Sequence, residues 1–298
     1  MATSSIPVDL RNPGQVFACL GLMEAAEILG DPAEGGFFWK DRETHVRFTL
    51  TTPGEADPVL TVLRFLTQAE VVALAPYHSG IRDSHKIRTV ETKNREFPCP
   101  LPAETALPIF LQADGVRVPI SHWVDSFGKY NIEKRLFISS GVDNVKFWAG
   151  NNSGAKIANL GLSIIKSVSD DIHSISAHPF AFAHPQSSSF RFDWRRDYIP
   201  LDVGFSPNDH DKKVRMVGYP LVELLAAIGL QHARPLRLQN LAYRYGAWGA
   251  RVPTLFARAM LGLSNPGFPI RSFTMHLGWP GKEGQARCIK DALEDTAP

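Results

Sequence analysis

The residues of this chain that could support metal binding or acid–base chemistry are histidines that lie beside carboxylates. The richest group is Asp209–Asp211, where a histidine stands between two aspartates, and a second group is Asp170–His173. His178 and His184 form a third pair. None of these groups has the ligand spacing of HExxH or of a CxxC-based zinc site. Exposed His and Asp in loops are much commoner than metal sites, so we expect no metal and no cofactor.

The sequence also lacks the motif of an activated nucleophile. It contains no GxSxG pattern and no paired serine and lysine of the hydrolase families. His85 beside Lys86 is a pair that a metal-free ribonuclease could use, with His85 or His78 as the general base. One histidine beside one lysine is weak evidence, and we therefore predict no catalytic residue and no enzyme activity.

The composition is that of an ordinary globular protein, with 44% hydrophobic and 21% charged residues among 298. No apolar run reaches the ~18 residues that a membrane-spanning helix needs, and the first residues lack the basic start and apolar core of a secretory signal. Cys19, Cys99 and Cys288 lie far apart without a CxxC pair, as in reduced cytosolic proteins. These features predict a cytoplasmic protein with no membrane partner.

Positive charge is concentrated in the second half of the chain. Residues 1–140 hold 14 Lys/Arg and 17 Asp/Glu, whereas residues 141–298 hold 18 and 13. Between Glu223 and Glu283 there is no acidic residue, although six arginines and one lysine fall there. Stretches of one sign mark surfaces for polyanions or for an acidic protein partner. Because arginine dominates and aromatic residues are interleaved, a polyanion is favoured over an ordinary solvated basic face.

Two segments of the second half combine basic, aromatic and amide side chains. Residues 146–156 form a Gly/Asn/Ser-rich loop that leads into a helix from about Ile157 to Val168, and the free N–H groups of such a helix start can hold phosphate. The loop has neither GxxxxGK[ST] nor GxGxxG, so nucleotide hydrolysis is not expected. In residues 187–206 arginines alternate with aromatic and acidic residues. These arginines could bind bases and phosphates, or an internal Asp–Arg network could hold the loop, and we weigh the two equally.

The elements that must position these residues begin with a strand at Ile6–Leu10 and an apolar helix from Val16. Asn12 suits the N-cap of this helix, Pro13 its first position and Gln15 the partner in a capping box. Because the helix is apolar nearly all round, we expect it to be buried.

Two strands, Gly36–Trp39 and His45–Leu50, follow this helix, and a second helix with the same capping device is predicted over Val59–Leu74. The order β-α-β-β-α is most of a ferredoxin-like unit, a fold that many RNA-binding proteins share. Pro108–Pro119 predicts a hairpin around a central Asp-Gly pair, and its first arm could supply the fourth strand of the unit.

The helix predicted at Tyr219–Leu230 is similar to the first helix, since aligning Gly229 with Gly21 also pairs Ala226 with Ala18. Two strands, a helix and a strand are predicted after it, at residues 236–241, 242–248, 254–263 and 270–277. This order predicts a second copy of the first unit, with convergent composition as the alternative.

We therefore predict an α+β protein built on a ferredoxin-like, RRM-like β-α-β-β-α unit with long insertions, which the repeat would duplicate. Residues 1–120 form the ferredoxin-like N-terminal half, and residues 121–298 form the basic C-terminal half with the Gly/Asn loop. The two halves can also be one continuous domain.

Four stretches of the chain resemble a small family of CRISPR-associated proteins of the type I-U (now I-G) interference systems. They are Val8–Leu22, Lys146–Gly154, Arg191–Arg195 and Tyr219–Leu230. The resemblance implies a subunit of a Cascade complex, either the compact large subunit or a RAMP-type backbone subunit, and the ferredoxin-like start favours the second. It carries over no catalytic residue, because DNA cleavage in these systems belongs to a separate nuclease-helicase.

Membership of that family would imply CRISPR RNA, target DNA and other Cascade subunits as partners. Base pairing supplies sequence specificity there, while the protein supplies contacts to nucleic-acid backbones and aromatic platforms. The expected nucleic-acid contacts are Lys146, Trp148, Asn151, Asn152, Lys156, Arg191, Trp194, Arg195, Arg196, Lys212, Lys213, Tyr243, Arg244, Trp248 and Arg251. Each could instead be structural, Trp194 most readily.

Two other functions stay open at this point. The first is a RAMP-type, metal-independent endoribonuclease that processes CRISPR RNA. The second is a protein-interaction scaffold whose basic face docks an acidic partner.

Overall fold

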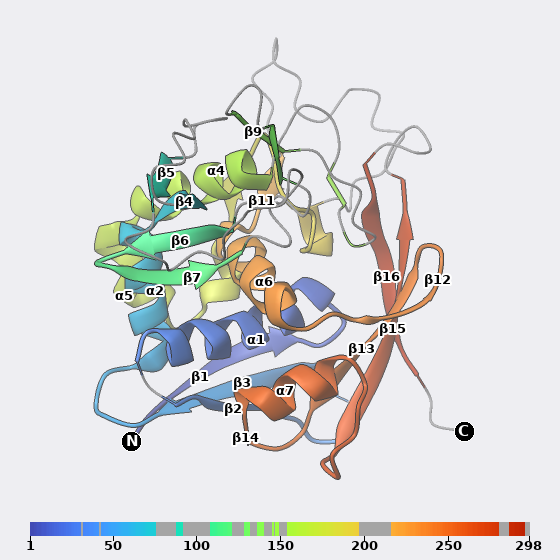
Figure 1. Ribbon diagram of the computed structural model, residues 1–298. Coiled ribbons are helices and arrows are strands. Elements are labelled where there is room, and N and C mark those ends of the chain that lie inside the picture. The colour runs from blue at the N-terminus through green and yellow to red at the C-terminus, as the bar shows by residue number, and fades with distance from the viewer. Residues whose placement is uncertain are drawn as a thin grey trace.

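The computed structural model describes residues 1–30, 32–41, 43–75, 88–91, 108–120, 128–131, 136–139, 145, 147–148, 154–196, 216–279 and 286–295, with the backbone alone for 128–131 and 136–139. The described residues form a mixed α+β structure of several small sheets, which confirms the predicted class (Figure 1). Helices α1 and α6 lie between the sheet at the bottom of Figure 1 and the elements above it. None of the helices in these residues has both the length and the apolar character needed to cross a bilayer.

The N-terminal sheet is antiparallel, with the strand order β1-β3-β2-β14. Its strands are β1 (Ala2–Asp9), β2 (Glu34–Phe38), β3 (His45–Thr52) and β14 (Val252–Pro253). The first three confirm the two strands and the opening strand expected from the sequence. Their order is that of the first three strands of a ferredoxin-like unit, in which the β1–α1–β2 crossover leaves room for the next strand between.

Helix α1 (Pro13–Ile28) follows β1 and is buried over almost its whole length, as its apolar sequence predicts. Its capping differs from the expected box. The side chain of Asn12 makes no cap bond, and Gln15 reaches back past it to accept a hydrogen bond from the N–H of Asp9 at 2.9 Å. Pro13 does occupy the first turn.

Helix α2 (Pro58–Gln68) is capped by Asp57, whose Oδ1 accepts from the N–H of Leu60 at 2.7 Å. The helix predicted to reach Leu74 therefore ends six residues earlier than expected, and the chain turns extended at Ala69. Residues Glu70–Ala75 form strand β4 instead. The β-branched Val71 and Val72 favour a strand, and the pairing of β4 with β6 decides the outcome.

A middle sheet has the strand order β5-β4-β6-β7, formed by β4, β5 (Arg88–Glu91), β6 (Ile109–Ala113) and β7 (Val116–Pro119). The predicted hairpin is confirmed as β6–β7. Asp114 and Gly115 have φ angles of 48° and 81°, the left-handed conformation that a two-residue hairpin turn of this kind needs. The proposed role of its first arm was wrong, because β6 pairs with β4 and not with β1.

The C-terminal sheet has the order β12-β13-β15-β16 and stands on the right of Figure 1. The elements after α6 (Pro220–His232) are β12 (Leu236–Gln239), β13 (Ala242–Trp248), β14, α7 (Thr254–Leu261), β15 (Ile270–Gly278) and β16 (Cys288–Glu294). The predicted succession of helix, two strands, helix and strand is thus confirmed, and β14 and β16 were missed. The strand before α6, β11 (Val217–Gly218), pairs with β10 (His184–Pro185) and not with this sheet.

The two apolar helices cross with their backbones in contact. A Cβ atom at Gly21 would lie 1.8 Å from the carbonyl oxygen of Leu225, and one at Gly229 would lie 2.2 Å from that of Phe17. The contacts are reciprocal, since each glycine meets the carbonyl four residues before the other glycine. The helix pair that the sequence aligned is therefore packed at the aligned glycines, and whether it is a true repeat stays a prediction.

The remaining elements are short, apart from one helix that packs against α6. They are β8 (Gly128–Asn131), β9 (Leu136–Ser139), α4 (Gly154–Lys166), α5 (Ile172–Ile175) and short 3-10 turns at Ser169–Asp171, Pro179–Ala181 and Trp194–Arg196. Helix α4 confirms the helix predicted from about Ile157.

Candidate functional site

The predicted nucleic-acid residues fall into several separate places. Five of them lie outside the described residues: Lys146, Asn151, Asn152, Lys212 and Lys213. Lys156 is exposed in the first turn of α4, and Arg251 is exposed beside the N-terminal sheet. Among the predicted residues that the structure describes, Trp148 lies against the segment 189–196.

Three of the predicted stacking rings belong to the core. Trp148 is 6% exposed and its ring meets the edge of Phe190 at 5.1 Å. Tyr243 and Trp248 are buried, and the indole Nε1 of Trp248 donates to the carbonyl oxygen of Gly35 at 2.9 Å. A base has no access to these rings in the folded chain. Trp194 is half-buried and packs against the core.

Arg195 is held by an internal network, as the alternative interpretation of its segment expects. Its guanidinium makes a bidentate pair with the fully buried Asp193, with Nε at 2.9 Å and Nη2 at 2.6 Å. It also donates to the carbonyl oxygen of Phe180 and lies over the ring of Tyr219 at 3.5 Å. Asp193 accepts in addition from the Asn12 side chain at 2.9 Å. Asn12 therefore ties this segment to the start of α1 and does not cap the helix.

The same segment closes the start of α6. The carboxylate of Glu223, in the first turn of α6, accepts from the backbone N–H groups of Phe192 at 3.4 Å and Asp193 at 3.1 Å. Glu223 is fully buried, and this burial raises its pKa to about 7 even though the hydrogen bond from the Asp193 backbone opposes the shift. Arg196, itself 4% exposed, is the nearby positive charge. Residues 189–196 are therefore a structural clamp on two helix starts.

The arginines of the acid-free stretch meet carboxylates from elsewhere in the chain. Arg258 forms a bidentate pair with Glu24 at 2.6 and 2.7 Å. The other pairs are Arg244–Asp295 at 2.9 Å, Arg251–Glu34 at 4.0 Å and Arg271–Glu294 at 2.7 Å. The acid-free stretch is therefore largely neutralised by carboxylates from other parts of the chain. Most of its arginines are not available to bind a polyanion.

The outer face of the N-terminal sheet carries a different set of exposed side chains. Pro7 of β1, Arg47 of β3 and Phe38 of β2 stand opposite one another in a single cross-strand row. Phe38 is 49% exposed, and Arg47 and the neighbouring His45 are exposed. The next row on the same face, Ser5 and Thr49 with Gly36, adds half-buried hydroxyl groups. At Gly36 this row is covered by the chain, because a Cβ atom there would lie 2.2 Å from the carbonyl oxygen of Ala250. We call this surface, defined by Phe38, His45, Arg47, Thr49 and Arg251, the β-platform.

Sequence reasoning missed the β-platform although the signal was present. In β3 the apolar Val46, Phe48 and Leu50 alternate with polar residues, which places Arg47 and Thr49 on the opposite face. The inner face packs on the helices, since Met23 of α1 lies against the inward side of the sheet at Gly35.

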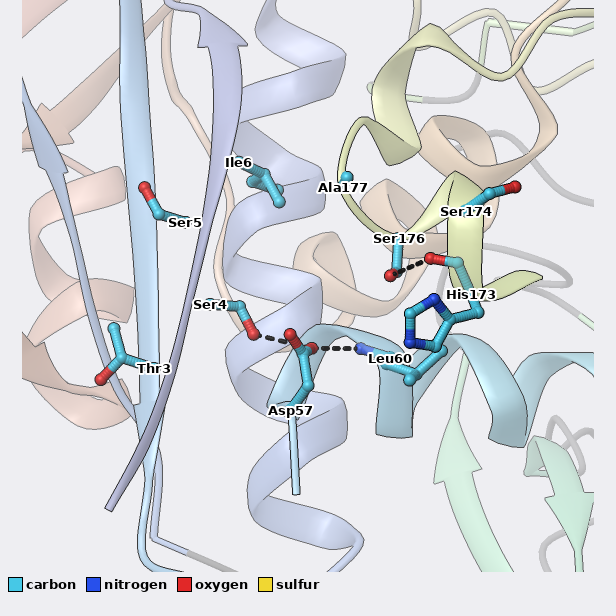
Figure 2. A pocket seen from close by; sticks show the side chains of 10 residues that line it. All are labelled: Thr3, Ser4, Ser5, Ile6, Asp57, Leu60, His173, Ser174, Ser176 and Ala177. Atoms are coloured by element: carbon cyan, nitrogen blue, oxygen red, sulfur yellow. Dashed lines mark hydrogen bonds between the residues drawn. The ribbon is translucent and has the colours of Figure 1, made fainter. Parts of the chain in front are cut away.

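A pocket of about 450 Å³ lies at the edge of β1 (Figure 2). One wall is β1 from Thr3 to Ile6, another is the start of α2 with Asp57 and Leu60, and the third is the stretch His173–Ala177 around α5. Ser4 and Asp57 point toward each other, with Ser4 Oγ donating to Asp57 Oδ1 at 2.8 Å. The pocket joins serine, aspartate and histidine, but Ser4 is 6% exposed and serves as an internal donor to the cap of α2. This arrangement does not activate a nucleophile.

Within the described ranges, no group of three or more His, Cys, Asp or Glu side chains is placed to hold a metal ion. The Asp170–His173 group lies in these ranges and the Asp209–Asp211 group lies outside them.

Comparisons with known proteins give no relative: no protein-family model matches the chain, and no curated protein or solved structure matches it either.

Proposed function

We propose that this chain is a non-catalytic, nucleic-acid-binding subunit of a type I CRISPR interference complex that contacts CRISPR RNA or target DNA. The context comes from the sequence resemblance. The observation that carries the binding role is the β-platform, an antiparallel sheet face that presents an exposed aromatic ring directly opposite an exposed arginine.

The chemistry of the β-platform suits single strands. An unstacked base can lie on the ring of Phe38, while the guanidinium of Arg47 reaches phosphate. Neighbouring strands lie ~4.8 Å apart, so the row from Pro7 to Phe38 spans ~10 Å, enough for successive nucleotides. Arg47 is oriented by its own sheet, since Nε donates to Ser5 Oγ at 2.8 Å. Arg251, 50% exposed in its side chain, borders the same face, but it lies 4.0 Å from the carboxylate of Glu34.

Arg47 and the ring of Phe38 then replace the larger predicted set as the first contacts to test. The core rings of Trp148, Tyr243 and Trp248 and the paired Arg195 keep structural roles in this proposal. The alternative endoribonuclease depends on His78 and His85, which lie outside the described residues.

The test is binding of a fluorescent single-stranded RNA at ~50 mM salt and over a salt series. We expect the logarithm of the affinity to fall linearly with the logarithm of salt concentration. Phe38→Ala should cost about 1–3 kcal/mol of binding by loss of stacking. Arg47→Gln should reduce the salt slope by about one, as removal of a single phosphate contact does.

Two matched controls separate the β-platform from general surface effects. Arg64→Gln removes an exposed cation from α2, on the other side of the sheet, and Leu255→Ala removes an exposed apolar side chain from α7. Both should bind like the unchanged protein. Absence of RNA and DNA binding at ~50 mM salt would overturn the proposal, and so would equal losses in the controls.

A further inference from the structure

The edge of β1 bears backbone groups that no strand pairs. In the described part of the chain β1 is the terminal strand of its sheet, because the strand that follows α2 joins the middle sheet instead. The backbone hydrogen bonds at the end of β1 show which of its residues direct their N–H and C=O groups away from the sheet. The N–H of Leu10 donates to Thr44 of the neighbouring strand, whereas the N–H of Asp9 turns away to Gln15. Odd-numbered residues of β1 therefore direct their N–H and C=O groups away from β3.

Three outward positions differ in what they offer. Thr3 presents both its N–H and its carbonyl oxygen, with no partner among the described residues. Ser5 presents its N–H only, because a guanidinium N–H of Arg47 donates to its carbonyl oxygen. Pro7 has no N–H, and proline is tolerated in strands where that position faces outward. The open part of the edge thus runs from Ala2 to Ser5 and ends at Arg47 and Pro7, two features that limit pairing.

This open stretch is also the wall of the pocket in Figure 2. His173–Ala177 lines the same pocket, whose volume is about 450 Å³, so a strand that paired with this edge would lie against that stretch. Added strands bind by main-chain hydrogen bonds, with pockets for alternate side chains. A pocket beside unpaired backbone groups has both parts of that arrangement.

Charge indicates the kind of side chain that fits. Asp57 is the carboxylate that lines the pocket, and its Oδ1 already accepts from Ser4 and from the N–H of Leu60. Its Oδ2 has no partner among the described residues. Asp170 and Asp171 are exposed and precede the wall residue His173 in sequence, but they do not line the pocket themselves. The pocket therefore favours a positively charged side chain.

We propose that the β1 edge binds an extended peptide segment of a partner protein, which pairs with Thr3 and Ser5 and places a lysine or arginine against Asp57. The segment takes the place that a fourth strand would fill beside β1. This binding is independent of the β-platform, so either proposal can fail without the other.

The test uses three synthetic peptides on the full-length protein, followed by amide NMR. The first is a six-residue strand of alternating valine and threonine with one central lysine. The second has the same side chains with alternate amides N-methylated, and the third has glutamate in place of lysine. The lysine peptide should shift and protect the amides of Thr3 and Ser5, and each of the other two should bind at least tenfold more weakly.

Two variants at one position test the backbone role directly. Thr3→Pro removes the outward N–H without touching the ladder to β3, and should weaken the lysine peptide at least tenfold. Thr3→Val removes only the hydroxyl and keeps the N–H, and should bind normally. Equal binding of the N-methylated peptide would reduce the site to a side-chain pocket and overturn the proposal. The absence of shifts in residues 2–6 with every peptide at millimolar concentration would overturn it too.

Discussion

The two ends of the α1–α6 helix pair both bury carboxylates, but they satisfy them differently. At the start of the helices, Glu223 accepts from backbone N–H groups of the clamp segment. At the far end, Glu24 is buried and takes a bidentate pair from Arg258 of α7. Helix starts carry partial positive charge and helix ends partial negative charge. A buried acid can therefore rely on backbone amides at the first end, whereas it needs a cation from another element at the second.

The contact between His232 and Glu24 illustrates the same difference between the two ends. Its Nδ1 lies 3.2 Å from Glu24, a distance that suggests an ion pair. Burial and the nearby Arg258 lower the pKa of His232 to about 4, so the imidazole is neutral at pH 7 and the contact is not ionic. The short distance does not require a charged imidazole, because Arg258 already neutralises Glu24. One cation is enough at this end.

The largest expected effect on the free energy of unfolding comes from forcing α1 and α6 apart. Gly21→Ala places a Cβ at 1.8 Å from a backbone carbonyl, which cannot rotate away, so both helices must move apart. We expect a loss of about 3 kcal/mol in the free energy of unfolding, measured by denaturant titration. Gly161→Ala in α4 is the control, since its Cβ meets only the flexible Leu224 side chain at 3.2 Å. Equal effects of the two substitutions would contradict the backbone contact.

A smaller loss is expected where the buried acid depends on one cation. Arg258→Leu leaves Glu24 buried without its arginine partner, and should cost about 2 kcal/mol, less than for a fully buried pair because the arginine side chain is 37% exposed. The double variant Glu24→Leu with Arg258→Leu should recover most of that loss. A double variant no more stable than Arg258→Leu alone would show that packing, not charge, is responsible.

The smallest effect is a pair of opposite pH dependences. Glutamate in an unfolded chain titrates near pH 4.3, so with a folded pKa of about 7 Glu223 makes the free energy of unfolding fall as pH rises between those values. For His232 the folded pKa of about 4 lies below the unfolded ~6.5, so stability rises with pH over that window. Each slope has a limit of about 1.4 kcal/mol per pH unit.

Two substitutions separate these slopes in denaturant titrations from pH 5 to 6.5. Glu223→Gln should make stability rise more steeply with pH, because it removes the falling contribution. His232→Gln should make stability rise less or fall. Identical slopes in both variants and the unchanged protein would mean that neither end titrates as argued.

Much of the local structure was predictable because it depends on neighbouring residues. The β6–β7 hairpin follows from an Asp-Gly turn, and α1 from a proline start and an unbroken apolar run. The end of α2 was not predictable in the same way, because Val71 and Val72 continue an apolar pattern that suits either state. Their pairing with β6, across a long sequence separation, settled it.

The candidate sites show the same division. Sequence alternation alone places Phe38 and Arg47 on one face of the β-platform, although the basic second half drew attention away from it. For the clamp segment, the sequence left an internal Asp–Arg network as the alternative to nucleic-acid binding. In the structure the side chain of Arg195 is paired with Asp193. Nothing in the sequence near Trp248 shows that its indole donates to Gly35, and so its place in the core was not predictable.

By itself the sequence determined where most helices and strands form, which faces are apolar and which half carries excess positive charge. The tertiary structure decided which charges stay available, because Glu24 meets Arg258 and Glu34 meets Arg251 only after folding. It also decided that β4 joins another sheet and leaves the edge of β1 open. The physical reason is that element formation is governed by local propensity and periodicity. Ion pairing and strand order depend instead on contacts between residues far apart in the sequence, such as Glu24 and Arg258, or on competing partners.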